Sequence, residues 1–82
     1  MNLALIHGEF SATDTLALLS QMIQIKIKYH ESKITTDSGE EDIKARESKI
    51  KKLQHEFALL KAQIQSGQNS FKIGGNIAVT PN

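Results

Sequence analysis

Large apolar residues recur every three or four positions along two stretches of the chain, and the two series mirror each other about a point near Ser38. Pairs taken outward from that point have residue numbers that add to nearly the same total, as for Ile34 with Ile43 and Leu16 with Leu60. Two antiparallel helices joined by a tight turn bring such pairs together. The pattern predicts a helix over about 12–35, a turn at 36–39 and a second helix over about 40–66.

The mirrored residues are expected to form the core between these two helices. They are aliphatic or aromatic with few exceptions, as the contact between paired helices requires. The predicted core consists of Leu16, Leu19, Ile23, Ile27, Ile34, Ile43, Ile50, Leu53, Phe57, Leu60 and Ile64.

Arg46 interrupts this apolar series in the second helix, and His30 lies at the matching level of the first helix with Glu47 also in reach. Polar groups at such positions commonly fix the register of paired helices. We predict a polar layer made of His30, Arg46 and Glu47. As a hypothesis, titration of His30 makes assembly sensitive to acid.

The ends of the helices carry local signals. Ser11 followed by Asp14 resembles a capping box, with the acidic group also favoured by the helix dipole, and predicts that the first helix starts near Ala12. Turn-forming residues fill positions 35–39. Two pairs offer a capping box for the second helix: Ser38 with Glu41, or Asp37 with Glu40.

The first helix carries a second apolar series, displaced by about 100° around its axis from the first. We call it the outer stripe; its members are Leu18, Met22, Ile25 and Tyr29. One partner helix cannot cover both series, so the outer stripe is the predicted oligomer interface. The resulting expectation is an all-α protein: an antiparallel two-helix hairpin, coiled-coil-like, that assembles as a four-helix bundle dimer. Alternatively, the stripe docks a different protein.

Both ends of the chain lack the helical pattern. Residues 1–10 are expected to form an extended arm, and the second helix should stop at Gly67. In the tail, 68–82, two short apolar runs flank Gly74-Gly75. This segment is expected either to form a short β-hairpin that turns at the glycines or to be only partly ordered, and it has a possible pairing partner in Leu3–Ile6 of its own or a neighbouring chain.

Composition narrows the function classes. The 82 residues include 10 Lys and Arg and 9 Asp and Glu, a net charge of +1, so the overall charge demands neither a nucleic acid nor an acidic membrane as partner. The chain has no cysteine and therefore no disulfide, thiolate metal site or cysteine nucleophile. No apolar run approaches the roughly 20 residues of a membrane span, and no secretory signal is recognisable, so a cytoplasmic location is expected, with signal-independent export left open.

No combination of side chains indicates catalysis. In the mirrored register, His30 and His55 are about 14 Å apart along the helix axis, and His7 lies on the arm, so the histidines share no metal ion within one chain. No serine or threonine has a histidine and a carboxylate at spacings typical of a triad. We therefore expect no enzyme activity, no metal and no cofactor.

The expected function is a small protein-protein interaction module, an adaptor, chaperone or assembly subunit, that acts as a homo-oligomer and engages a client protein. The alternative is a small nucleic-acid-binding regulator that uses basic residues of the second helix. The basic residues in question are Lys44, Arg46, Lys49, Lys51 and Lys52, and they scatter around most of the helix circumference. No aromatic residue near them is free for base stacking. A third class, a subunit that polymerises head to tail, needs heterologous contacts.

Overall fold

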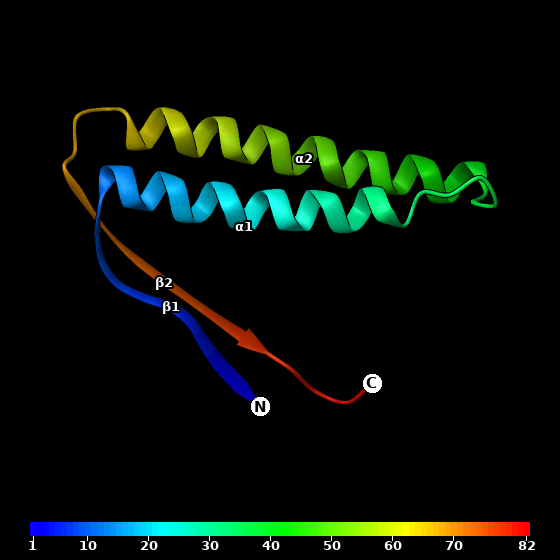
Figure 1. The fold of residues 1–82 in the computed structure, drawn as a ribbon, viewed down its shortest axis with the longest axis horizontal. Coiled ribbons are helices and arrows are strands. Elements are labelled where there is room, and N and C mark those ends of the chain that lie inside the picture. The colour runs from blue at the N-terminus through cyan, green and yellow to red at the C-terminus, as the bar shows by residue number, and fades with distance from the viewer.

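The computed structural model describes residues 1–82 as four elements: β1 (Asn2–Ser11), α1 (Ala12–Ser32), α2 (Glu40–Ile64) and β2 (Ser70–Ala78). The two helices lie side by side and antiparallel (Figure 1). Both strands leave the same end of the helix pair and form a narrow sheet that diverges from α1, with the two termini at its far end (Figure 1). The molecule therefore has two regions, a helix pair and a sheet.

The prediction of an all-α fold is wrong. Strands of 10 and 9 residues pair in antiparallel order from Asn2 opposite Ala78 to Ser11 opposite Ser70. The chain is a small α+β protein, and neither "helical hairpin" nor "four-helix bundle" describes it. Of the alternatives open for the tail, pairing with Leu3–Ile6 of the same chain is the one that forms. It extends from Asn2 to Ser11, because each terminal segment supplies the hydrogen-bonding partner of the other.

The glycine pair of the tail does not make a turn. Gly74 and Gly75 lie inside β2, opposite His7 and Ile6 of β1. A hairpin turning there would have left two strands of only a few residues, which is marginal in water. Pairing with β1 of the same chain instead gives one continuous ladder.

Ser11 joins the two regions. It is the last residue of the strand ladder and also the N-cap of α1, where its Oγ accepts a hydrogen bond of 3.0 Å from the backbone N–H of Asp14. The backbone N–H of Ala12 donates to the carbonyl of Asn69 at 2.9 Å, which extends the pairing by one more bond. The helix begins at Ala12, as the sequence predicted, and the sheet is tied directly to it.

The connection between the helices differs from the expected one. α1 ends at Ser32 instead of continuing to about 35, and α2 is capped by Gly39 without a side-chain hydrogen bond. Neither proposed capping box forms. The hydroxyl of Ser38 instead accepts from the backbone N–H of Thr35 at 3.0 Å, so it stabilises the turn and not the helix.

The core is thin and lies between the helices. Each of the eleven residues expected there is buried or partly buried, but Ile27 and Ile64 are the only apolar residues of the chain that are buried. Thr15 and His30 complete the buried set. The radius of gyration is 15.5 Å, against about 12 Å for a compact chain of this length. The chain is thus extended, with little interior.

Candidate interaction surfaces

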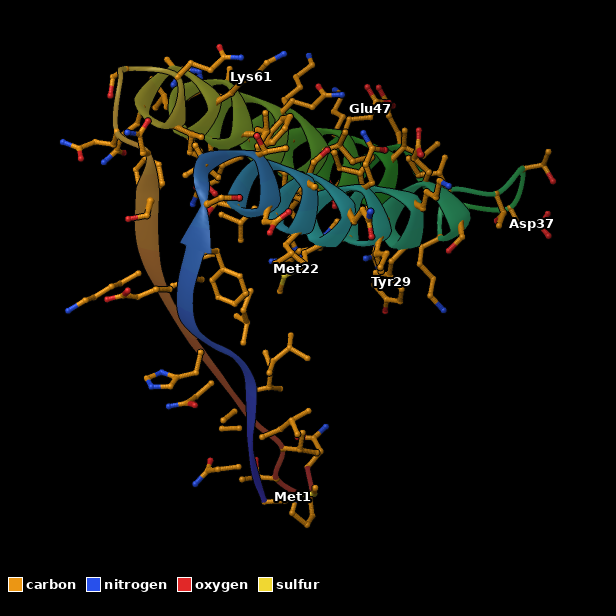
Figure 2. All side chains as sticks on the ribbon, turned by 60° about the vertical axis from the view of Figure 1, so that its left-hand side comes forward. Met1, Met22, Tyr29, Asp37, Glu47 and Lys61 are labelled. Carbon is orange, nitrogen blue, oxygen red and sulfur yellow. The ribbon has the colours of Figure 1, made fainter.

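The outer stripe of α1 stays open to solvent. Ile25 is 69% exposed and Tyr29 53% exposed, Leu18 is exposed, and Met22 is partly covered. Met22 and Tyr29 lie on the side of α1 from which the sheet descends (Figure 2). The structure therefore leaves three of the four predicted interface residues exposed and the fourth, Met22, partly exposed.

Cations flank the end of the outer stripe. Lys33 Nζ lies 5.5 Å and Arg46 Cζ 5.7 Å from the centre of the Tyr29 ring, and the ring of His30 meets it edge-on at 5.6 Å. Cation–π contacts of this kind hold a half-exposed ring in place. Tyr29 therefore presents a fixed aromatic surface.

The sheet has a second apolar surface that the sequence analysis did not identify. In β2, alternate residues point to one side, and their partners across the ladder point to the same side: Phe71 pairs with Phe10, Ile73 with Gly8, Gly75 with Ile6, and Ile77 with Leu3. Met1 and Val79 exchange backbone hydrogen bonds of 2.9 and 2.8 Å and extend the series. We call this side the apolar face; its large members are Met1, Leu3, Ile6, Phe10, Phe71, Ile73, Ile77 and Val79.

A β-bulge makes the apolar face continuous. Ala4 and Ile6 pair with the neighbouring residues Asn76 and Gly75, so Leu5 is an extra residue in β1. One extra residue reverses the alternation of the strand that carries it. Leu3, an odd position, therefore shares a face with Ile6 and Phe10, which are even positions.

Two glycines flatten this face. A Cβ at Gly75 would lie 3.2 Å from Cγ2 of Ile6, and one at Gly8 would lie 3.7 Å from the ring of Phe10. The large side chains lean over the positions where side chains are missing. Gly8 also has a φ of 143°, a conformation that residues with a side chain rarely adopt.

The opposite side of the sheet is polar. His7, Glu9 and Lys72 alternate with residues of the apolar face, and Ser11 and Asn76 lie on the same polar side. All five are exposed. The sheet is therefore amphipathic, with one polar, solvent-exposed face and one apolar face.

Two of the three residues predicted to form the polar layer come together in the structure. Arg46 Nη1 lies 3.0 Å from His30 Nδ1, and a guanidinium only donates hydrogen bonds, so Nδ1 is the acceptor and the imidazole is neutral. Glu47 is exposed, and its side chain makes neither a hydrogen bond nor an ion pair. The structure brings His30 and Arg46 together across the helices and leaves Glu47 outside.

Burial lowers the pKa of His30, and the positive charges of Arg46, Lys49 and Lys26 lower it further. Each of these causes disfavours the imidazolium. The side chain of His30 is buried between the helices and is a fixed acceptor for Arg46.

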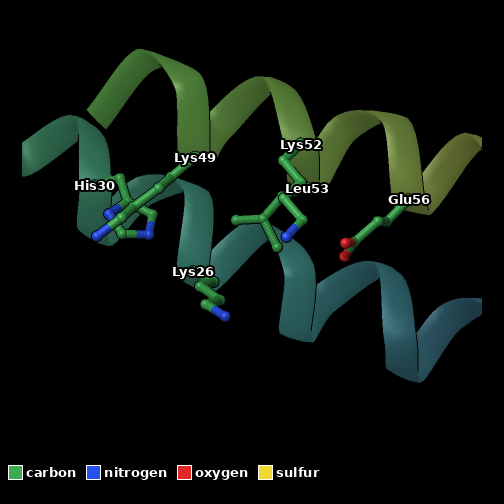
Figure 3. Close-up of a pocket in the computed structure, with 6 residues that line it drawn as sticks. All are labelled: Lys26, His30, Lys49, Lys52, Leu53 and Glu56. Atoms are coloured by element: carbon green, nitrogen blue, oxygen red, sulfur yellow. The ribbon is translucent and has the colours of Figure 1, made fainter. Parts of the chain in front are cut away.

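Basic side chains line two shallow hollows, one between α1 and α2 and one where the connection between the helices meets α2. Lys26 and His30 of α1 and Lys49, Lys52, Leu53 and Glu56 of α2 line the first (Figure 3). The second adds Lys33 and Arg46 to Lys49, together with Asp42. The helix pairing therefore gathers cations that the sequence of the second helix alone shows as scattered.

The structure contains no group of three or more His, Asp or Glu side chains placed to hold a metal ion. Neither helix combines the length and apolar character needed to cross a bilayer. No family model, curated protein or solved structure matches the chain.

Proposed function

We propose that this chain is a small protein-protein interaction module, an adaptor, chaperone or assembly subunit, that works as a homo-oligomer. The outer stripe of α1 is its first interface. Function then resides in apolar surfaces presented by a small α+β scaffold and not in a catalytic site.

The observation that carries this proposal is the excess of exposed surface. The chain exposes 6610 Å², whereas a compact protein of 9.1 kDa exposes about 4,900 Å². The excess of about 1,700 Å² corresponds to roughly two standard interface patches of about 800 Å² each.

The character of this surface supports the same conclusion. Leu18, Ile25 and Tyr29 are exposed large apolar residues on a single helix face. Contiguous apolar patches on a water-exposed surface mark interaction sites, and aromatic residues are enriched at the centres of interfaces. A second copy of the chain carries the same apolar stripe and can therefore supply the surface that covers the first.

The test is the molar mass in solution of the wild type and of Ile25→Lys, by light scattering over a range of concentrations. We expect the wild type to be at least a dimer and Ile25→Lys to have a lower mass at every concentration, because a lysine in the stripe must be desolvated on association.

Leu59→Lys is the matched control. Leu59 is 61% exposed on α2, close to the 69% of Ile25, but lies outside the stripe. Its substitution should leave the mass unchanged. A wild type that is monomeric and folded contradicts the proposal, as does an equal loss of mass in the two variants.

A second candidate function is binding of nucleic acid, which the lysines and arginine lining the two hollows favour. Cations from both helices contribute: Lys26, Lys33, Arg46, Lys49 and Lys52. Such a cluster attracts phosphates, and the affinity it provides weakens steeply with salt.

The measurement for this candidate is fluorescence anisotropy with labelled single- and double-stranded oligonucleotides at several salt concentrations. Lys49 lines both hollows, so Lys49→Gln should weaken binding and reduce the salt slope. Lys61→Gln, which removes a cation that lines neither hollow, is the control. Equal effects of the two substitutions, or binding that is insensitive to salt, contradict this function.

A further inference from the structure

We infer that the apolar face of the sheet is a second self-association surface, and that the same face of a second copy covers it, so that two sheets stack face to face. This inference rests on the proposed self-association and adds a surface to it. The proposed function names the outer stripe of α1, whereas this surface belongs to β1 and β2.

The first support is the composition of the face. Over the length of the ladder it presents large apolar residues and two glycines, and no charged or polar side chain. All charged residues of the two strands lie on the other side: Glu9 and Lys72, with His7 beside them. This separation is what a sheet packed on one face requires.

The second support is that the face lies open within the chain. The sheet diverges from α1 along its length (Figure 1). The large residues at its far end are exposed: Met1, Leu3, Ile77 and Val79. Those nearer the helices are partly exposed: Ile6, Phe10, Phe71 and Ile73. An isolated two-stranded sheet is marginal in water. A sheet of nine ladder pairs with one wholly apolar side therefore needs a cover that is present whenever the chain is folded.

A second copy of the chain is the partner that meets this condition, because it is available from synthesis onward. The exposed area is large enough for this. The excess of about 1,700 Å² of surface over a compact chain equals roughly two patches of about 800 Å² per partner, and two self-association surfaces are proposed.

The flatness of the face favours a sheet as the covering element. Ile6 leans over Gly75 and Phe10 leans over Gly8, so the missing side chains leave no deep groove for a helix ridge. Flat sheet faces stack about 10 Å apart with their side chains interdigitated. A two-fold axis near the middle of the ladder places Ile6 close to Ile6 of the second copy.

The test uses the absence of cysteine from the chain. Ile6→Cys and His7→Cys introduce single thiols at neighbouring positions that point to opposite faces of the sheet. Each variant is treated with a bis-maleimide whose spacer matches the roughly 10 Å between stacked sheets. We expect Ile6→Cys to be converted largely into covalent dimer and His7→Cys to remain almost entirely monomeric on a denaturing gel.

Several outcomes overturn the inference. Equal cross-linking of the two variants indicates pairing through the sheet edges, because strands joined edge to edge present both faces at the same distance. If neither variant cross-links while the wild type keeps an oligomeric mass, the inference of stacked sheets is wrong and the proposed function still holds. A monomeric wild type contradicts both the inference and the proposed function.

A second pair of variants guards against local misfolding at Ile6. Ile77→Lys places a charge on the apolar face, and Ala78→Lys places the same charge on the neighbouring, exposed residue of the polar face. We expect Ile77→Lys to lower the molar mass and Ala78→Lys to leave it unchanged. The double variant Ile77→Lys with Ile25→Lys should be a monomer. An unchanged molar mass for Ile77→Lys contradicts the inference, even if Ile25→Lys dissociates the oligomer that forms through the outer stripe.

Discussion

The helix pair and the sheet are stabilised in different ways. All four buried residues of the chain belong to the helices, and none belongs to the sheet. The helices have a thin core of their own, with a hydrogen bond between His30 and Arg46 inside it. The sheet has a complete backbone ladder but no interior. The contrast shows that regular hydrogen bonding alone does not make a region independent, because its apolar side still needs cover.

The largest effect is expected in the helix pair, from Ile64→Ala. Ile64 is 3% exposed, the most buried apolar residue of the chain. Its truncation removes buried methyl groups and leaves a cavity, so the free energy of unfolding should fall by about 3 kcal/mol. Chemical denaturation followed by circular dichroism measures this loss. Leu59→Ala, a truncation at an exposed site of the same helix, should change it by less than about 0.5 kcal/mol. Similar losses for the two variants would mean that the helix pair has no real core.

The two regions also differ in how far the sequence predicted them. Helix positions follow from local spacing, so Leu16, Ile27 and Phe57 could be assigned to one side of their helices from the chain alone. The start of α1 at Ala12 depended on a local cap and was also predictable.

The apolar face was not predictable in this way. Its register depends on residues more than 60 positions apart, such as Leu3 and Ile77. The bulge at Leu5 breaks the odd-even alternation of β1, so the strand looked weakly patterned. In β2 the alternation of Phe71, Ile73 and Ile77 is regular, but Gly74-Gly75 was interpreted as a turn. A search for alternation that allows one inserted residue would have found both strands.

The next effect is expected in the sheet, from Gly8→Ala. Gly8 has a φ of 143°, which an alanine adopts only with strain of about 1 to 3 kcal/mol. We expect faster amide hydrogen exchange in β1 and β2 and little change in the helices. Exchange measured by mass spectrometry resolves the two regions. Gly74→Ala is the control, because a Cβ there meets no atom within 4 Å and its φ is not in the positive range. Equal exchange in these two variants would contradict the strained position of Gly8.

A smaller and opposite effect is expected from Thr15→Val. Thr15 is 2% exposed and its hydroxyl Oγ1 has no hydrogen-bond partner. Replacing that hydroxyl with a methyl group of similar size removes the cost of an unsatisfied buried polar atom, so the protein should gain about 1 kcal/mol of stability. Thermal and denaturant unfolding measure the gain. Thr13→Val, at an exposed position in the same turn of α1, should not stabilise the chain. A loss of stability in Thr15→Val would show that the hydroxyl is hydrogen-bonded in solution.

The smallest effect concerns pH and again separates the regions, because His30 belongs to the helix pair and His7 to the sheet. Burial, then Arg46, Lys49 and Lys26, lower the pKa of His30 in the folded chain below the ordinary value of 6.5. The unfolded chain therefore binds the proton more readily, and acid favours unfolding. The stability that His30 contributes is complete above about pH 6.5 and is lost as the pH falls through the lower pKa of the folded state.

Unfolding should thus become easier on mild acidification of the wild type below about pH 6.5. His30→Asn should flatten this part of the pH profile, and His55→Asn, at an exposed position of α2, should leave it intact. Denaturation midpoints at a series of pH values measure the profile. If His30→Asn keeps the full acid sensitivity, the titrating group lies elsewhere; if His7→Asn removes it, the sheet and not the helix pair senses acid.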